Sequence, residues 1–141
     1  MAESMSVQGD FNRAPIPRDN QPRRILIVDD SDVVRRGIRL FLERTGYLCI
    51  EAAGGAEAIT KARDSKLDLI VMDIVMPGIN WIEATSLIKS TMPRLPIIAF
   101  TMYESMAKAM TSKLAIHTVV SKSDGLVKLV ESIQSVLGPI S

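Results

Sequence analysis

The sequence predicts a doubly wound α/β fold, in which helices cover both faces of a parallel sheet. Short continuous apolar runs recur between residues 24 and 138, amphipathic helical patterns separate them, and Gly or Pro stands at many junctions. Runs without polar alternation are typical of strands buried on both faces of a parallel sheet. With 141 residues, 47% of them hydrophobic and 23% charged, the composition suits one globular domain.

The first apolar run is Ile25-Leu26-Ile27-Val28, and it stops at Asp29-Asp30. Ser31 or Asp32 can cap the helix that follows, and Gly46 is suited to ending it. Spacings of four, seven and eight residues define one apolar face of this helix. The expected apolar face comprises Val34, Ile38, Phe41 and Leu42. The charged residues on the other faces are expected to be solvated, namely Arg35, Arg36, Arg39, Glu43 and Arg44.

The same alternation continues along the chain. We expect further strands over residues 47–52, 67–73, 96–101 and 117–122. The expected helices between and after them cover residues 56–64, 81–91, 104–114 and 125–137. Asp124 is expected to cap the last helix, and Gly138-Pro139 to end it.

Three regions are expected from composition. Residues 1–23 hold three of the seven prolines without a sustained period, which indicates a flexible tail, residues 24–138 form the domain, and residues 139–141 end the chain. A net charge of +1 offers no electrostatic signature for nucleic acid. No signal-peptide pattern is present, and the apolar runs are far shorter than the ~20 residues that span a bilayer. We therefore expect a cytoplasmic protein, with the single cysteine, Cys49, in the core.

Chemically active side chains stand where the predicted strands end. Asp29 and Asp30 follow the first strand, Asp73 ends the third, Thr101 ends the fourth and Lys122 ends the fifth. Ligands of open α/β sheets bind beyond the carboxyl ends of the strands. Three clustered carboxylates need a compensating cation, and Mg²⁺ prefers such oxygen ligands. The group suits phosphoryl transfer, in which an aspartate can act as the nucleophile.

Four segments together resemble the receiver domain of two-component response regulators. They are Ile-Leu-Ile-Val-Asp-Asp (25–30), Leu-Ile-Val-Met-Asp-Ile-Val-Met-Pro-Gly (69–78), Pro-Ile-Ile-Ala-Phe-Thr (96–101) and Val-Val-Ser-Lys-Ser-Asp (119–124). The resemblance extends from Ile25 to Leu137. It implies a flavodoxin-like doubly wound (βα)5 sandwich with a five-stranded parallel sheet.

The resemblance also implies roles for the residues at the strand ends. Asp73 matches the phospho-acceptor, and Asp30 and Asp73 match direct Mg²⁺ ligands, with Asp29 acting partly through water. The backbone carbonyl of Val75 matches a further metal ligand. Thr101 matches the hydroxyl that swings toward the phosphoryl group, and Lys122 matches the lysine that pairs with it.

Members of the family are phosphorylated from a phosphohistidine on a sensor histidine kinase or a histidine phosphotransfer protein. The resemblance therefore implies a signalling switch that assists its own phosphorylation and dephosphorylation, not an enzyme. It places the responding face on the fourth helix, fifth strand and fifth helix. We expect a downstream protein or a second copy of the chain to bind through residues 102–137, with no direct nucleic acid or membrane contact.

Four residues depart from the usual pattern of the family. Trp81 and Met102 stand where small residues are common, Val119 where an aromatic residue is common, and Ser123 where proline is frequent. The first three bear on kinetics and coupling, and leave the acceptor chemistry as implied. Tyr103, with Val75, stands at a position that tunes phosphate loss in relatives, and we hypothesise that the two exclude water.

Methionines at positions 102, 106 and 110 share one helical face, which is either core or an adaptable surface for a partner. His117, the only histidine, is expected to begin a strand.

Two other functions are consistent with parts of the pattern. Asp30-Ser-Asp32-Val-Val34 mimics the nucleophile motif of haloacid dehalogenase-like phosphatases, and such an enzyme would need Asp30 while Asp73 would be dispensable. Alternatively, the domain is an interaction module whose signal does not depend on phosphorylation. An acyl-phosphate mimic would leave the surface and oligomeric state of such a module unchanged.

Overall fold

A computed structural model of the protein describes residues 21–74 and 81–140. Val75 and nearly all of the segment expected to be a flexible tail lie outside the described residues. The strands are β1 (Arg24–Val28), β2 (Leu48–Ala52), β3 (Leu69–Met72), β4 (Ile97–Thr101) and β5 (Thr118–Ser121). The helices are α1 (Asp32–Thr45), α2 (Gly55–Asp64), α3 (Trp81–Thr91), α4 (Glu104–Leu114), the 3-10 turn η3 (Lys122–Asp124) and α5 (Gly125–Leu137).

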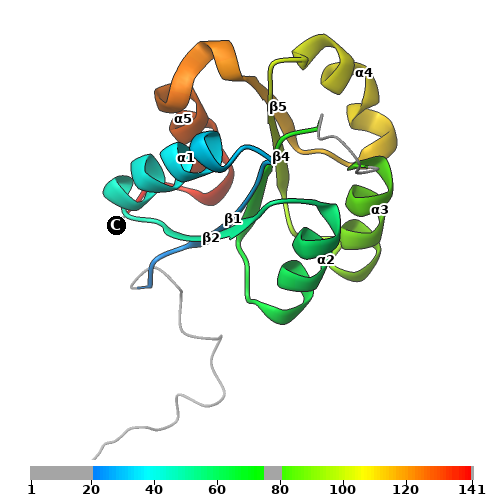
Figure 1. Ribbon diagram of the computed structural model, residues 1–141, viewed down its shortest axis with the longest axis horizontal. Coiled ribbons are helices and arrows are strands. Elements are labelled where there is room, and N and C mark those ends of the chain that lie inside the picture. The colour runs from blue at the N-terminus through cyan, green and yellow to red at the C-terminus, as the bar shows by residue number, and fades with distance from the viewer. Residues whose placement is uncertain (1–20, 75–80, 141) are drawn as a thin grey trace, which may run out of the picture.

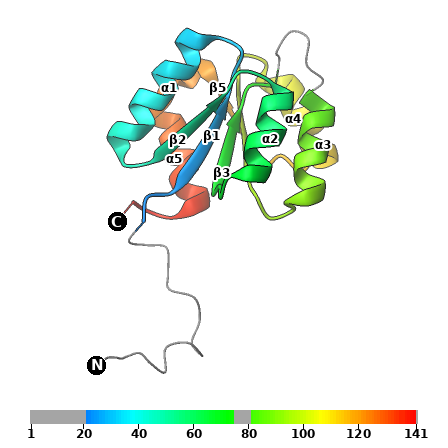
Figure 2. The ribbon, with the colours of Figure 1, turned by 60° about the horizontal axis from the view of Figure 1, so that its bottom comes forward.

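The strands form one parallel sheet in the order β2-β1-β3-β4-β5. Helices α1 and α5 cover one face, and α2, α3 and α4 cover the other (Figures 1 and 2). This order is that of the flavodoxin-like doubly wound fold, so the predicted fold class is confirmed.

Alternating strand residues enter two different cores. Ile25 and Ile27 of β1 pack in the cluster that includes residues of α1 and α5, whereas Leu26 and Val28 pack in the cluster that includes α2 and α3. All four of these side chains are buried, as expected for a strand with covered faces. Cys49 is also buried, which confirms its predicted place in the core, and burial raises the pKa of its thiol to about 12.

The register of the central strands aligns their carboxyl ends. Val28 of β1 pairs with Met72 of β3, and the amide of Asp73 donates to the carbonyl of Val28 over 2.9 Å. Residues that directly follow these two strands therefore meet at one edge of the sheet. Figure 2 shows the strands directed toward that edge, and the described N- and C-terminal parts of the chain at the opposite one.

Two predictions about the starts of helices were wrong. Val34 is 38% exposed, because the first turn of α1 begins beyond the end of β1, where the sheet no longer lies beneath it. Asp124 occupies the position before α5 but its side chain caps nothing. Its backbone is already helical, because η3 continues directly into α5, and Ser121 provides the cap for η3 by accepting from the amide of Ser123.

Candidate functional site

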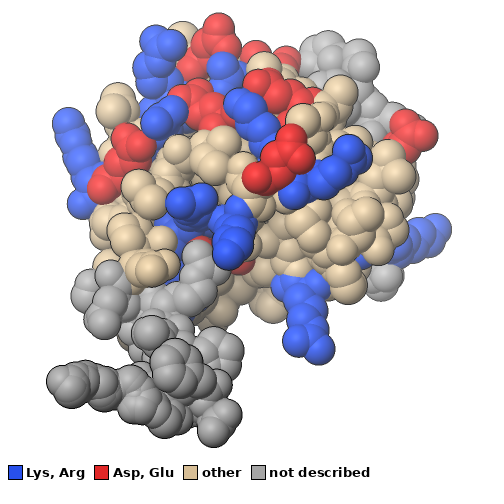
Figure 3. Space-filling view, turned by 90° about the horizontal axis from the view of Figure 1, so that it is seen from below, with Lys and Arg blue, Asp and Glu red and all other residues tan. Residues whose placement is uncertain are grey.

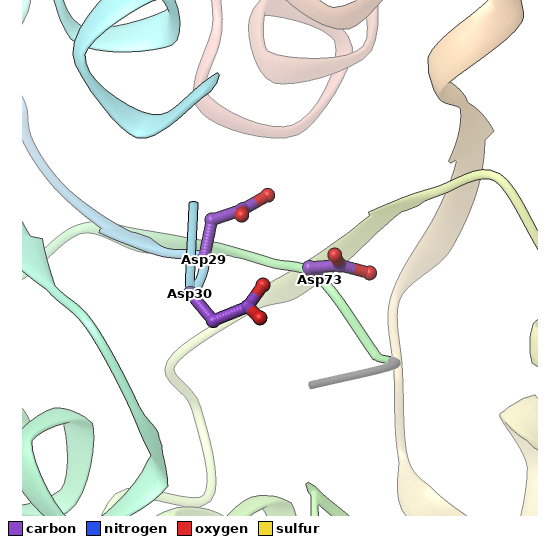
Figure 4. A group of neighbouring side chains, drawn as sticks. All are labelled: Asp29, Asp30 and Asp73. Carbon is purple, nitrogen blue, oxygen red and sulfur yellow. The ribbon is translucent and has the colours of Figure 1, made fainter. Parts of the chain in front are cut away.

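Three carboxylates gather where β1 and β3 end. Asp29, Asp30 and Asp73 each offer a carboxylate oxygen, and these oxygens all lie within 4.8 Å of one another (Figure 4). Asp29 and Asp73 are buried, with 2% and 9% of their surface exposed, whereas Asp30 is exposed. The site is therefore recessed, with one carboxylate at its mouth.

Lys122 brings a cation to the two buried carboxylates. Its Nζ lies 2.7 Å from Oδ2 of Asp29 and 3.1 Å from Oδ2 of Asp73. Burial disfavours the ammonium form, but the hydrogen bonds and charges of the two aspartates outweigh it, and the pKa of Lys122 rises above its ordinary value. Lys122 stays protonated, so it balances part of the negative charge at neutral pH.

Thr101 reaches the same edge of the sheet from β4, at the end of the strand between β3 and β5. The residue is fully buried, and its Oγ1 accepts a hydrogen bond of 3.0 Å from the amide of Tyr103. The hydroxyl is thus engaged by the turn that leads into α4.

Asp29 is fixed at four points. Its amide donates to Ala52 of β2, and its Oδ1 accepts from the amide of Ser31 over 2.9 Å. Lys122 holds the other carboxylate oxygen, and Arg35 donates to the backbone carbonyl over 2.6 Å. Four hydrogen bonds therefore hold the residue at which the loop from β1 to α1 begins.

The prediction that Arg35 lies on a solvated face was wrong. Only 11% of its side chain is exposed, because its guanidinium lies between Asp29, Asp32 and Glu51. The amphipathic pattern of α1 assigned it to the solvated side, and so did not indicate this role. The sequence offers one signal, the acidic residue Glu51 on the strand expected over residues 47–52.

The residues that depart from the family pattern lie in two different environments, one partly buried and one exposed. Trp81 and Val119 are partly buried and pack against a cluster that includes Ile74 and Ala99. Met102, by contrast, is 64% exposed, and Tyr103 and Met106 are also exposed. Of the three methionines on one face, Met110 alone packs against the core, so this face is mainly surface.

The residues present fit a hard divalent cation. The donor set consists of oxygens from Asp29, Asp30 and Asp73, and such a set suits Mg²⁺, which keeps several waters and binds one or two carboxylates with phosphate oxygens. The exposed carboxylate of Asp30 leaves a path for the ion. Val75, whose carbonyl is expected to be a further ligand, lies outside the described residues.

Charge elsewhere is mixed. On the face seen in Figure 3, basic and acidic side chains are interspersed, without a broad area of one sign. Among the described residues, no helix combines the length and apolar character needed to cross a membrane.

Comparison with known proteins links this geometry to one family. The family model of the response regulator receiver domain matches residues 25–134 of this chain. Phosphorylation and Mg²⁺ binding at an acidic pocket are characteristic of receiver domains.

Two curated relatives carry the similar region within longer chains. One is the CAI-1 autoinducer sensor kinase/phosphatase CqsS of Vibrio cholerae, 34% identical over 102 residues, which are 70% of this chain and 15% of the relative. The other is the response regulator GacA of Pseudomonas viridiflava, 40% identical over 83 residues, which are 57% of this chain and 39% of the relative. The chain thus spans well under half the length of these relatives.

Two solved structures match this chain along nearly the full length of the solved protein. The response regulator TrrA of Thermotoga maritima in complex with Mg²⁺ and BeF has a TM-score of 0.74 and 32% identity, and the match covers 81% of this chain and 98% of that one. TrrA in complex with the histidine kinase ThkA matches with the same TM-score of 0.74 and 33% identity, over 82% of this chain and 98% of that one.

Proposed function

This chain belongs to the response regulator receiver domain family, and on that premise we propose that it is a switch activated by phosphorylation of Asp73. The donor is a phosphohistidine of a sensor histidine kinase or a histidine phosphotransfer protein. Receiver domains interact with histidine kinases, as TrrA does with ThkA. The protein acts in the cytoplasm as a signalling component, not as an enzyme.

The observation that carries the proposal is the shared contact of Lys122 with Asp29 and Asp73. One ammonium group holds two buried carboxylates at distances of 2.7 and 3.1 Å, so the Asp73 side chain is oriented and partly neutralised before a donor arrives. Catalysis of phosphoryl transfer depends mainly on such positioning and charge compensation. A structural ion pair alone would not require the third carboxylate, Asp30, at the mouth of the site.

In the proposed reaction, a carboxylate oxygen of Asp73 attacks phosphorus as the bond from phosphorus to the donor histidine nitrogen breaks. The histidine leaves with the electron pair of that bond, and Asp73 becomes an aspartyl phosphate. Asp30 and Asp73, with Asp29 partly through water and the backbone carbonyl of Val75, would hold Mg²⁺, and the bound ion would supply charge neutralisation at the phosphoryl oxygens. Lys122 stays protonated and pairs with the phosphoryl group that Asp73 has gained.

The proposed output begins at Thr101. A phosphoryl group adds roughly −1.5 to −2 charges and strong acceptor oxygens, which draw in the Thr101 hydroxyl. That hydroxyl then releases the amide of Tyr103, and the turn into α4 rearranges. Met102, Tyr103 and Met106 are exposed beside this turn, so the change reaches a surface within residues 102–137 that suits a downstream protein or a second copy of the chain.

The proposal is tested by incubating the protein with Mg²⁺ and acetyl phosphate and measuring intact mass. We expect the wild-type protein to gain one phosphoryl group, and Asp73→Asn to gain none. Asp124→Asn is the matched control, because Asp124 is exposed and its side chain makes no cap, and it should behave as wild type.

Other outcomes favour the alternatives. Catalytic release of phosphate from a phosphomonoester that requires Asp30 and not Asp73 would favour a phosphatase of the haloacid dehalogenase type. A protein that binds Mg²⁺ but accepts no phosphoryl group, and does not respond to beryllofluoride, would favour an interaction module.

A further inference from the structure

Arg35 makes a contact that neither the resemblance nor the reaction assigns. It lies in the first turns of α1, and each of its three guanidinium nitrogens has a different acceptor. Nε donates to Glu51 over 2.7 Å, Nη1 donates to the backbone carbonyl of Asp29 over 2.6 Å, and Nη2 bonds to the carboxylate of Asp32. A planar guanidinium with three filled directions has a single orientation.

The contact with Asp29 bears on Asp30. The carbonyl of Asp29 and the amide nitrogen of Asp30 belong to one planar peptide group, so a donor that holds the carbonyl also fixes the orientation of that plane. The backbone leaves the sheet at this point, just after the amide of Asp29 has bonded to Ala52. The peptide group that Arg35 holds therefore helps to set the direction in which the side chain of Asp30 points.

Glu51 keeps Arg35 in place. It stands on the neighbouring strand β2, only 22% of its side chain is exposed, and its second carboxylate oxygen accepts from Arg39 over 2.9 Å. Hydrogen bonds from Arg39 and Arg35 lower the pKa of Glu51, although burial acts in the opposite direction, so the carboxylate stays ionised at neutral pH. The chain of contacts thus runs from the edge strand through one arginine to the metal-binding loop.

We propose that Arg35, oriented by Glu51, is a positioning residue that sets the affinity of the acidic site for Mg²⁺ by fixing the peptide between Asp29 and Asp30. The inference rests on the proposed function, since it concerns the same site. Removal of groups that orient metal ligands typically lowers metal affinity by about 10- to 100-fold.

Charge and positioning predict opposite signs, which makes the inference testable. Arg35→Gln removes a cation near three carboxylates, so electrostatics alone predicts tighter binding of Mg²⁺, whereas loss of positioning predicts weaker binding. Arg35→Lys keeps the charge but cannot hold three acceptors in one plane. Arg39→Lys is the matched control, because Arg39 bonds to Glu43 and Glu51 from the same helix face.

The experiment is calorimetric titration of each metal-free protein with Mg²⁺, with thermal unfolding in EDTA as the check on folding. We expect Arg35→Lys and Arg35→Gln each to weaken binding by about ten-fold, with Arg39→Lys unchanged. Glu51→Gln, a milder change that leaves Arg35 in the chain, should weaken binding less and in the same direction. Saturating Mg²⁺ should restore phosphorylation of the Arg35 variants by acetyl phosphate, because Arg35 does not act at Asp73.

Two results would overturn the inference. One would leave the proposed function intact, and the other would overturn the proposed function as well. Unchanged or tighter Mg²⁺ binding by both Arg35 variants, beside a wild-type protein that binds Mg²⁺ and is phosphorylated, would overturn the positioning role alone. A wild-type protein that neither binds Mg²⁺ nor accepts a phosphoryl group would overturn the proposed function with it. If the Arg35 variants fail to fold, a Glu51→Gln protein that binds Mg²⁺ with the affinity of the wild type would overturn the positioning role instead.

Discussion

At the level of single residues, the ion pairs between α1 and Glu51 should make the stability of the protein depend on pH. Glu51 accepts from Arg35 and Arg39, and these bonds hold the pKa of its carboxyl below the ordinary value of 4.5. A group whose pKa is lowered on folding stabilises the protein when it is ionised in both states. Its contribution is present above the unfolded pKa and is lost as the pH falls through the folded one.

Glu51→Gln should therefore lower the free energy of unfolding at pH 7 by about 1–2 kcal/mol, the size of a few charge-assisted bonds at a half-buried site. The difference from the wild-type protein should shrink as the pH falls below 4.5 toward the lower folded pKa. Urea unfolding curves recorded between neutral and acidic pH measure this. A difference that stays constant over that range would show that packing, not ionisation, causes the loss.

The sequence predicted some site residues and missed others for a physical reason. Asp29, Asp73 and Lys122 could be placed together because parallel strands bring all their carboxyl ends to one edge. The side chain of Arg35 could not be placed, because helical periodicity separates apolar from polar faces but does not say what a polar side chain meets. Its partner Glu51 lies on β2, and only the fold brings β2 beside α1.

At the scale of elements, α1 is a helix with well-defined ends. Ser31 accepts from the amide of Val34 at the start, so of the two predicted candidates, Ser31 and Asp32, the cap is Ser31. Gly46 ends the helix with φ of +115°, and its amide donates to the carbonyls of Leu42 and Glu43. A residue with a Cβ adopts this conformation only at a cost, so the glycine is required at this position.

Two substitutions in this element should have opposite effects. Gly46→Ala should destabilise the protein by about 1–2 kcal/mol, because of the left-handed backbone, and its Cβ would stand 3.2 Å from Cγ2 of Ile140. Gly37→Ala, in the exposed middle of α1, should stabilise it by about 0.5–1 kcal/mol, because the new Cβ would meet nothing within 4 Å apart from its chain neighbours and the backbone of its own helix. Urea midpoints of the two variants provide the measurement, and a shift in the same direction for both would contradict the prediction.

Element types were predictable, whereas details at their ends were not. Apolar runs identified the interior strands β1, β3 and β4, because both faces of each are covered. Both wrong predictions concern helix starts, namely the exposed Val34 and Asp124, whose side chain caps no helix. The local backbone there depends on how a loop leaves the sheet. Periodicity carries no information about that geometry.

At the scale of the whole molecule, the proposed switch needs a sheet that stays fixed and a turn after β4 that moves. Thr101 is buried on the platform, and its hydroxyl holds the amide of Tyr103 just before α4. In the proposed switch, a single hydrogen bond thus links the chemistry to the exposed residues of α4. The helix α1, on the other face of the sheet, shares no such bond with Thr101.

Hydrogen exchange should report this division. Binding of beryllofluoride with Mg²⁺ should speed exchange at the amide of Tyr103 and change exchange along α4, while the amides of the second half of α1 keep their rates. Thr101→Ala should already exchange quickly at Tyr103 and show a smaller response to beryllofluoride. Exchange measured by NMR resolves the single amide of Tyr103, and equal rates along α4 with and without beryllofluoride would argue against the proposed route.

The edge of the sheet opposite the acidic site has a consequence for modular architecture. The described chain enters β1 and leaves α5 at that far edge, as Figure 2 shows, and Ile140 lies close to the end of α1. A segment that continues from either end of the described chain, at residue 21 or 140, would begin a full strand length from Asp73. Partners attached at these two positions would therefore start on the side of the sheet away from the acidic site.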